Sequence, residues 1–420
     1  MRRVPPALIV TRGLVLVGLC ALACTGRERT PELDDSPRET SPSTVDVPVE
    51  AAPASTDARA DSPSGDLPDT EALAAARRRS DLSFDEEVRL FPAWLAAERD
   101  PQADPGPAWR WRGTVEGWIF EPEEDGKLRQ SLVAQLRVAA GGEEMTLQSD
   151  IAVERIRPFL VDNERGEELD LMLGSALART TASTAGGRFG AELVVHDGPT
   201  RGAPVRREVR LVTRPDDARR FVGSVFLLPP SGVLVVSDID DTIKHSDVRD
   251  KVALLRTTFL EPHRFVGGMA SRYRGWTEAG AHLHFVSASP WQLYAGLRAA
   301  MDEAGFPAAS YALRSLRVDT VDLIRLLSDD SESVKGPAIE AMLARLPEWR
   351  FVLVGDSGEK DPEIYGRIAR QFPERVIAVY IRDVSGEARA SARYATAFEG
   401  VDPAKWSLFR DGSELPETLE

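Results

Sequence analysis

The second half of the chain alternates apolar runs of strand length with stretches of helical spacing, and this order restricts the fold more than any other feature. Strands are predicted at residues 233–238, 281–289, 350–357 and 376–382, and helices at 291–305, 334–347 and 363–373. Strands connected through helices form parallel sheets by right-handed crossovers, with helices on both faces. Residues 229–410 are therefore predicted to form an α/β domain.

Residues 84–228 show a different pattern, in which short runs alternate apolar and polar residues between Gly- or Pro-containing turns. The clearest runs are WRWRGTVEGWIF (109–120), SLVAQLRVA (131–139), RFGAELVVHDG (188–198) and VRREVRLVT (205–213). Alternation with period two is typical of half-buried strands. We therefore expect a smaller antiparallel β domain of sandwich or barrel type, with its aromatic residues packed in the core or forming a ligand-binding face.

The first 24 residues have the pattern of a signal peptide. Arg2 and Arg3 precede the apolar run 14–23, which is short for a bilayer span and ends in small residues. Cys24 in ALAC resembles the acylated cysteine of a bacterial lipobox, so export and an N-terminal lipid anchor are expected, with simple secretion or an uncleaved anchor as alternatives. Residues 25–80 are acidic and rich in Pro and Ser, which predicts a disordered tether with a short helix at 70–79.

Composition excludes some functions. The net charge of −15 and the pI near 5.0 argue against a general nucleic-acid binder. Both cysteines, Cys20 and Cys24, lie in the signal segment. The mature chain is therefore expected to contain no disulfide and no cysteine-based metal or catalytic site.

Polar residues follow the predicted parallel strands where each strand ends. Asp238, Ser287 and Asp356 occupy such positions, and Lys335 is expected at the start of a helix. Ligands of open α/β sheets bind beyond the carboxyl ends of the strands. Carboxylates that converge there can bind Mg²⁺, a hard cation that takes oxygen ligands. The sequence therefore predicts a phosphoryl-transfer site.

The chemistry of these groups suggests a role for each. Asp238 can attack phosphorus to give an aspartyl-phosphate, and Asp240 can protonate the leaving oxygen and then activate water. Ser287 and Lys335 can hold the phosphoryl oxygens. Ser289 competes with Ser287 for this role.

The motifs resemble a known family. The run 238–242, DIDDT, resembles the DxDxT motif of haloacid dehalogenase-like phosphatases, and GDSGEKD at 355–361 resembles their fourth motif. Together with RTTFLEPHRFVGGMA and FVSASPWQLY, these runs are similar to the catalytic domain of actin-patch type Mg²⁺-dependent phosphatidate phosphatases. The resemblance covers about residues 229–382 and extends more weakly into the β region.

The resemblance implies a Rossmannoid parallel sheet and a role for each matching residue. It makes Asp238 the nucleophile and Asp240 the acid/base, whose backbone carbonyl also binds the metal. It further implies phosphate binding by Thr242, Ser287 and Lys335. The metal residues are expected to be Asp238, Asp240 and Asp356, with Asp361 either a direct ligand or a support for the ligands. Lys244 or Lys360 would replace Lys335 if that match is wrong, and residues 243–286 are expected to form a light helical cap.

The predicted function is that of a Mg²⁺-dependent phosphatase of the cell envelope, acting on phosphatidate through an aspartyl-phosphate. Two alternatives remain open. One is a phosphatase for soluble or protein phosphates, and the other is an envelope binding protein whose β domain acts beside a non-catalytic phosphatase-like domain. No nucleic acid and no obligate protein partner are expected.

Overall fold

The structure is a computed structural model that describes residues 70–103, 108–122, 133, 134, 136, 149–315 and 331–419. The predicted signal peptide, Cys24 and the tether up to residue 69 lie outside these residues. The helix predicted at 70–79 is confirmed as α1 (Thr70–Arg79). Within the described part of the chain, no helix has both the length and the apolar character needed to cross a bilayer.

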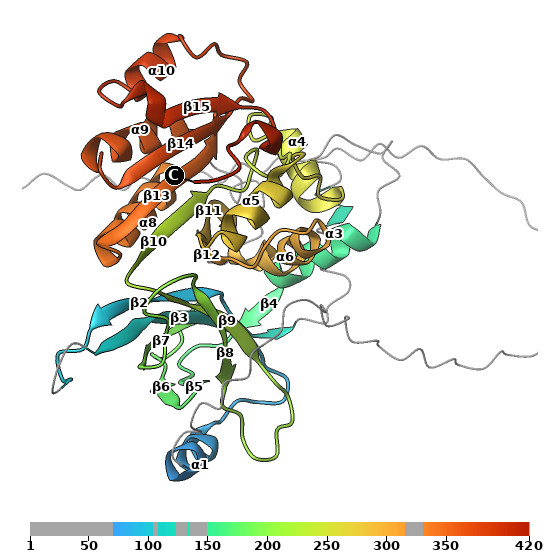
Figure 1. The fold of residues 1–420 in the computed structure, drawn as a ribbon. Coiled ribbons are helices and arrows are strands. Elements are labelled where there is room, and N and C mark those ends of the chain that lie inside the picture. Colours follow the sequence, from blue (N-terminus) through green and yellow to red (C-terminus); the bar gives the residue numbers. More distant parts are fainter. Residues whose placement is uncertain are drawn as a thin grey trace, which may run out of the picture. The chain divides into compact units, whose positions relative to one another are not determined.

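The second half of the chain forms a six-stranded sheet in which every pairing is parallel (Figure 1). The strand order is β12-β11-β10-β13-β14-β15. The strands are β10 (Ser231–Ser237), β11 (His282–Pro290), β12 (Ser310–Arg314), β13 (Glu348–Asp356), β14 (Val376–Arg382) and β15 (Trp406–Phe409). The prediction of an α/β domain with a parallel sheet is confirmed.

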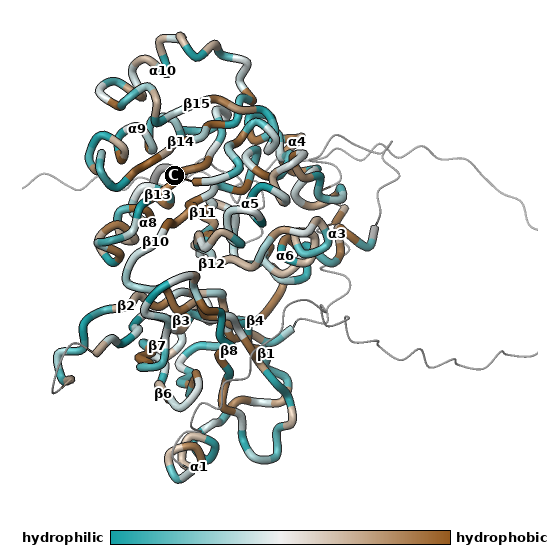
Figure 2. Tube along the Cα trace, viewed as in Figure 1, coloured by the Kyte–Doolittle hydropathy of each residue, from teal (hydrophilic) through white to brown (hydrophobic). Residues whose placement is uncertain are grey.

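Helices cover both faces of this sheet because its central strands are apolar on both sides. On β10, Leu234 and Val236 pack into the cluster that contains α8 (Ser331–Arg345) and α9 (Asp361–Gln371). Val235 lies between them in sequence and packs into the cluster that contains α5 (Met269–Glu278) and α6 (Tyr294–Glu303). Figure 2 shows the hydrophobic residues concentrated along these strands. Strands buried on both faces are typical of parallel sheets.

The other helical elements described between residues 229 and 419 are short. They are α4 (Lys251–Leu255), the π-helix η2 (Arg256–Leu260), α10 (Ala392–Ala397) and the 3₁₀ turns η3 (Trp291–Leu293), η4 (Pro403–Lys405) and η5 (Gly412–Glu414). Between Thr242 and Ser287, helical structure is limited to α4, η2 and α5. This agrees with the light helical cap that was expected there.

The preceding region forms a nine-stranded sheet that is antiparallel except for one pair. Its strands are β1 (Glu87–Leu90), β2 (Ala93–Arg99), β3 (Trp109–Pro122), β4 (Val161–Asn163), β5 (Asp170–Leu173), β6 (Ala176–Arg179), β7 (Arg188–Val195), β8 (Val205–Leu211) and β9 (Val222–Leu228). The exception is the parallel pair β2–β9, whose strands lie far apart in the sequence and so need no tight turn.

One predicted strand of this region is wrong. Val133, Ala134 and Leu136, within the run 131–139, are helical. Val133 and Leu136 are three residues apart, which also fits one face of a helix, and both are buried. They pack in a cluster with residues of α3 (Ser149–Ile156), of the 3₁₀ turn η1 (Arg157–Phe159) and of η2.

The antiparallel sheet packs against the parallel-sheet part of the chain. On β3, Ile119 belongs to the core of the antiparallel sheet, whereas Trp118 and Phe120 belong to the core around α5 and α6. On β9, Phe226 and Leu228 belong to the core that contains α8 and α9. The two sheets therefore share buried apolar surface, which favours one compact unit.

Candidate active site

Asp238 lies one residue beyond β10, at the carboxyl edge of the parallel sheet. Its backbone N–H donates to the carbonyl of Val354 at 2.9 Å and continues the pairing with β13. The Thr242 hydroxyl donates to Asp238 Oδ2 at 3.0 Å. The Asp238 side chain is buried, so the strand end holds this carboxylate in one orientation.

Asp241 organises the loop that follows, a role that the sequence analysis missed. Its carboxylate accepts from the backbone N–H groups of Ser246, Asp247 and Val248 at 2.7 to 3.0 Å. Its φ of 54° lies in the left-handed region, which costs a non-glycine residue backbone strain. The third acid of DIDDT therefore stabilises the loop on which Asp240 lies.

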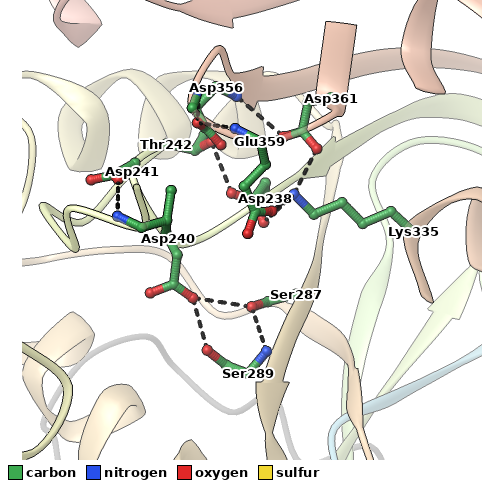
Figure 3. A network of polar contacts seen from close by, with 12 residues as sticks. Asp238, Asp240, Asp241, Thr242, Ser287, Ser289, Lys335, Asp356, Glu359 and Asp361 are labelled. Carbon is green, nitrogen blue, oxygen red and sulfur yellow. Dashed lines mark hydrogen bonds and ion pairs between the residues drawn. The ribbon is translucent and has the colours of Figure 1, made fainter. Parts of the chain in front are cut away.

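A group of buried acids surrounds Asp238 (Figure 3). Asp356 ends β13 and Asp361 begins α9, and each offers an oxygen within 4.8 Å of an oxygen of Asp238. The Lys335 ammonium contacts Asp238 Oδ1 at 2.9 Å, Asp361 Oδ1 at 2.6 Å and Glu359 Oε2 at 3.0 Å. We call these five residues the acidic side of the site.

Burial sets the proton affinities on the acidic side. It raises the pKa of Asp238 well above its usual value, and the Lys335 ammonium offsets only part of this effect. It raises the pKa of Asp356 in the same way, and the neighbouring Asp361 adds to the rise. Burial would lower the pKa of Lys335, but the carboxylates, with Asp238 first, raise it well above its usual value. The single ammonium of Lys335 therefore does not neutralise the carboxyl groups that surround it.

A divalent cation would supply the positive charge that these acids lack. Asp356 Oδ1 accepts from the N–H groups of Gly358 and Glu359, whereas Asp356 Oδ2 is buried without a hydrogen-bond partner among the described residues. A buried carboxylate oxygen without a partner is costly unless it binds a cation. Both oxygens of Asp361 are occupied, one by Lys335 and one by the N–H of Asp356. Both oxygens of Asp238 also have partners, Lys335 and Thr242. Of the three acids, Asp356 is therefore the one with an oxygen left for direct coordination, and Asp238 and Asp361 lie within reach of the same ion.

Asp240 lies on the other side of Asp238, among different partners (Figure 3). Its Oδ1 contacts the Lys244 ammonium at 2.8 Å and accepts from the Ser246 hydroxyl at 2.7 Å. Its Oδ2 accepts from the hydroxyls of Ser289 at 2.8 Å and Ser287 at 3.2 Å. We call Asp240 and these four partners the hydroxyl side of the site. Its side chain does not belong to the acid cluster that Asp238 forms with Asp356 and Asp361.

The two sides shift the pKa in opposite directions. Burial would raise the pKa of Asp240, but the Lys244 ammonium and the hydrogen bonds from the two hydroxyl groups of Ser246 and Ser289 hold it below its ordinary value. Asp240 is therefore ionised at neutral pH, and its charge is satisfied within the protein.

The structure also bears on the alternatives left open by the sequence. Lys335 contacts Asp238, whereas Lys244 pairs with Asp240 and Lys360 is exposed before α9. Lys335 lies inside α8, which begins at Ser331, and not at the start of the helix as expected. Ser287 and Ser289 both donate to Asp240, so both remain candidates. Glu359, Lys244 and Ser246 were not predicted as primary site residues, and only their proximity to the motifs could have suggested them.

Carboxylates and an ammonium that gather at the carboxyl edge of a parallel sheet are typical of α/β enzyme domains. Residues 233–383 match the family model described as the catalytic domain of phosphatidate phosphatase APP1. The match confirms the resemblance that the motifs predicted, and it supports a phosphatase enzyme.

Two curated relatives were found. An uncharacterised protein of Schizosaccharomyces pombe is 31% identical over 175 residues, which is 40% of this chain and 28% of that protein. Phosphatidate phosphatase APP1 of Saccharomyces cerevisiae is 29% identical over 244 residues, which is 56% of this chain and 41% of the yeast protein. The chain thus spans less than half the length of either relative.

Solved structures give little further information. A multi-modular chitinase from Paenibacillus is 10% identical to the chain, and the match covers 73% of this chain and 22% of the chitinase, with a TM-score of 0.16. A carbohydrate esterase is 9% identical, and the match covers 74% of this chain and 94% of the esterase, with a TM-score of 0.18. Such scores carry no argument about the fold.

Proposed function

We propose that the chain is a Mg²⁺-dependent phosphatase of the haloacid dehalogenase-like type, which hydrolyses a phosphate monoester through an aspartyl-phosphate. The observation that carries this proposal is the position of Asp238: a buried carboxylate at a strand end, with an ammonium on one side and a second aspartate two residues away. The match of residues 233–383 to a phosphatase catalytic domain supports it.

Asp238 and Asp356 would hold the cation, together with the backbone carbonyl of Asp240, and Asp361 would keep them in position. When bound, Mg²⁺ neutralises the acids and withdraws charge from the phosphoryl oxygens. The partnerless Asp356 Oδ2 is the feature of this chain that fits such a role.

The chain's own residues then account for two steps. In the first, an Asp238 oxygen forms a bond to phosphorus while the bond from phosphorus to the ester oxygen breaks, and Asp240 gives a proton to that oxygen. Asp240 is ionised in the free site, and it would take up this proton when the negative charge of a bound phosphate ester raises its pKa. In the second, Asp240 takes a proton from water, the water oxygen attacks phosphorus, and the Asp238 carboxylate is restored as phosphate leaves. Lys335 and Ser287 stabilise the negative charge on the phosphoryl oxygens.

Phosphatidate is the substrate that we propose, with water as co-substrate and diacylglycerol and phosphate as products. The support comes from the relatives, since the yeast protein of which the chain covers 41% is named a phosphatidate phosphatase. Soluble and protein phosphates are the alternative, since the groups assigned around Asp238 act on the phosphoryl group, which all these substrates share.

A substrate panel tests this proposal. Phosphate release would be measured with Mg²⁺ from phosphatidate vesicles, glycerol 3-phosphate and a phosphopeptide, with the Asp238→Asn variant as the control. The proposal predicts release from phosphatidate that depends on both Mg²⁺ and Asp238. Faster release from the phosphopeptide than from phosphatidate would mean that the substrate is a protein phosphate. Phosphate release that does not depend on Asp238 would refute the mechanism.

Export and lipid anchoring are proposed from the sequence, because Cys24 lies outside the described residues. An anchor would bring the catalytic part to a lipid surface. Metabolic labelling with a fatty acid, compared between wild type and Cys24→Ser, tests this point. Equal labelling of the two proteins would exclude acylation at Cys24.

A further inference from the structure

A cavity of about 340 Å³ lies beside the hydroxyl side of the site and reaches across to the antiparallel sheet. This volume falls within the range of small-molecule pockets, about 300 to 1,000 Å³. Its walls come from β1, β3, α3, β4, α6 and the segments around residues 244, 258 and 263. The matched catalytic region, 233–383, supplies only part of them.

Two residues connect the cavity to the acid/base aspartate. Lys244 and Ser289 line the cavity, and each contacts the Asp240 carboxylate at 2.8 Å. Asp240 is the group that we assign to protonate the leaving oxygen. The part of the substrate attached to that oxygen must therefore lie on the side of Asp240, which is the side of the cavity.

Strand β1 brings a cation to this cavity. The side chains of a strand alternate between its two faces. Val88 and Leu90 enter the core of the antiparallel sheet, whereas Glu87 and Arg89 face the cavity. Arg89 Nη1 is buried and has no hydrogen-bond partner among the described residues. A buried N–H group without a partner is costly and suits an oxygen acceptor on a ligand.

A second unused group lies on the catalytic part of the chain. His263 also lines the cavity, and its Nδ1 is buried without a partner within the described ranges. Burial lowers the pKa of His263, so the ring is neutral and can donate or accept a hydrogen bond.

The remaining wall of the cavity is mainly apolar. Phe120 and Val161 come from the antiparallel sheet, and Leu293, Leu297 and Leu313 come from the parallel-sheet part. Charged side chains also line the cavity, among them Glu154, Arg155 and Arg157. A lining of both kinds suits a ligand that has an apolar segment and several oxygen atoms. The cavity would therefore suit a hydrocarbon segment with a few oxygen acceptors better than a bare sugar or a peptide phosphate.

We propose that the antiparallel sheet completes the substrate site: the cavity holds the acyl-bearing part of the phosphate ester, and Arg89 binds its ester oxygens. This inference rests on the proposed phosphatase function and assigns to the β region a role in substrate selection. Phe91, which directly follows β1, stacks on Trp291 with ring centroids 3.8 Å apart. This contact holds β1 against the catalytic part of the chain.

Gly296 offers a direct way to fill the cavity. It lies in α6 and lines the cavity, and a Cβ added there would meet nothing within 4 Å. Gly275 in α5 is the matched control, because an added Cβ there also meets nothing and the residue does not line the cavity. Both substitutions to leucine favour the helix.

The experiment compares dioctanoyl phosphatidate with glycerol 3-phosphate, which has the same ester oxygen but lacks the acyl chains. Gly296→Leu should lower the ratio of kcat/KM for the lipid to that for glycerol 3-phosphate by about tenfold or more. Gly275→Leu should leave this ratio unchanged. An unchanged ratio in Gly296→Leu would overturn the proposal.

Arg89→Met tests the β region itself. Its control is Arg210→Met, on an exposed arginine of β8 outside the cavity. Arg89→Met should raise KM for dioctanoyl phosphatidate about tenfold and change kcat little, because the lost contact is made equally in the ground and transition states. If both arginine variants resemble wild type, Arg89 does not bind substrate and this part of the inference fails. If wild type hydrolyses neither ester, the proposed function fails and takes this inference with it.

Discussion

Asp238 and Asp240 lie two residues apart, yet their surroundings differ in kind. On the acidic side, the carboxyl groups of Asp238, Asp356, Asp361 and Glu359 surround the ammonium of Lys335. On the hydroxyl side, Asp240 has its own ammonium and three hydroxyl donors.

This difference separates two tasks. The acidic side is short of positive charge and therefore suits a divalent cation, which in turn would attract a negatively charged phosphoryl group. The hydroxyl side is satisfied without any ligand, so that Asp240 is held ready for proton transfer. Environments that shift two carboxyl groups in opposite directions are a common sign of divided roles in catalysis. Four experiments test whether the two sides have these separate roles.

Removal of the nucleophile should have the largest effect. Asp238→Asn keeps the size of the side chain but cannot form the aspartyl-phosphate, so phosphate release should fall about 10³-fold or more. Circular dichroism and thermal melting should show a folded protein. Asp216→Asn, in an exposed turn of the β region, is the matched control. Activity within about tenfold of wild type would remove Asp238 from the chemistry.

Loss of the partnerless oxygen should abolish the response to metal. After treatment with a chelator, saturating Mg²⁺ should raise the melting temperature of the wild type by about 5 °C, because binding to the folded state adds stability. Asp356→Asn should lose most of this shift and about 10²-fold of the activity.

Asp383→Asn provides the control for this metal experiment. Asp383 follows β14, the neighbouring strand, and lies outside the acid cluster. The Asp383→Asn variant should keep the rise in melting temperature that Mg²⁺ causes in the wild type. A full shift in Asp356→Asn would mean that the cation binds elsewhere.

Lys244→Met should have a smaller effect that depends on pH. The pKa of Asp240 is lowered, so its charged form stabilises the fold above the ordinary aspartate pKa, and this contribution is lost as the pH falls through the folded value. Without Lys244, burial dominates and the pKa of Asp240 rises. The acidic limb of the kcat profile should move to higher pH, with about tenfold lower kcat at pH 6. Lys251→Met, on an exposed lysine nearby, should not move the limb.

The two serines should give the smallest effects and can be ranked. Ser287 is buried, and its hydroxyl is oriented by the backbone N–H of Ser289 at 3.0 Å. Ser287→Ala should lower kcat/KM about tenfold, and Ser289→Ala about threefold, because the Ser289 side chain is half-buried and less restrained. The opposite ranking in steady-state kinetics would assign the phosphate-binding role to Ser289.

Part of the site could be predicted because Asp238 and Asp356 each end an apolar run of strand length. Asp238 and Asp356 lie at strand ends whose positions are set by burial on both faces, which the sequence shows directly. The pairing of Lys244 with Asp240 could not be predicted, because it depends on the left-handed turn at Asp241 and its three backbone contacts.

The run 131–139 shows the limit of periodicity. Its apolar residues fit a strand by alternation and a helix by the spacing of Val133 and Leu136, and only burial against α3 and η2 selected the helix. Short apolar runs carry both patterns, so tertiary contacts decide between them.

The parallel sheet and the residues at its carboxyl edge could be predicted from the sequence alone, because apolar runs and the polar residues that end them are local features of the chain. Which carboxylate each lysine contacts, and the wall that β1 and β3 form beside Asp240, depend on the folded structure. The contact of Lys335 with Asp238 and the wall formed by β1 and β3 join residues far apart in sequence, and the wall depends on how two sheets pack through shared apolar surface. Lys244 and Asp240 are only four residues apart, but their pairing depends on the turn at Asp241.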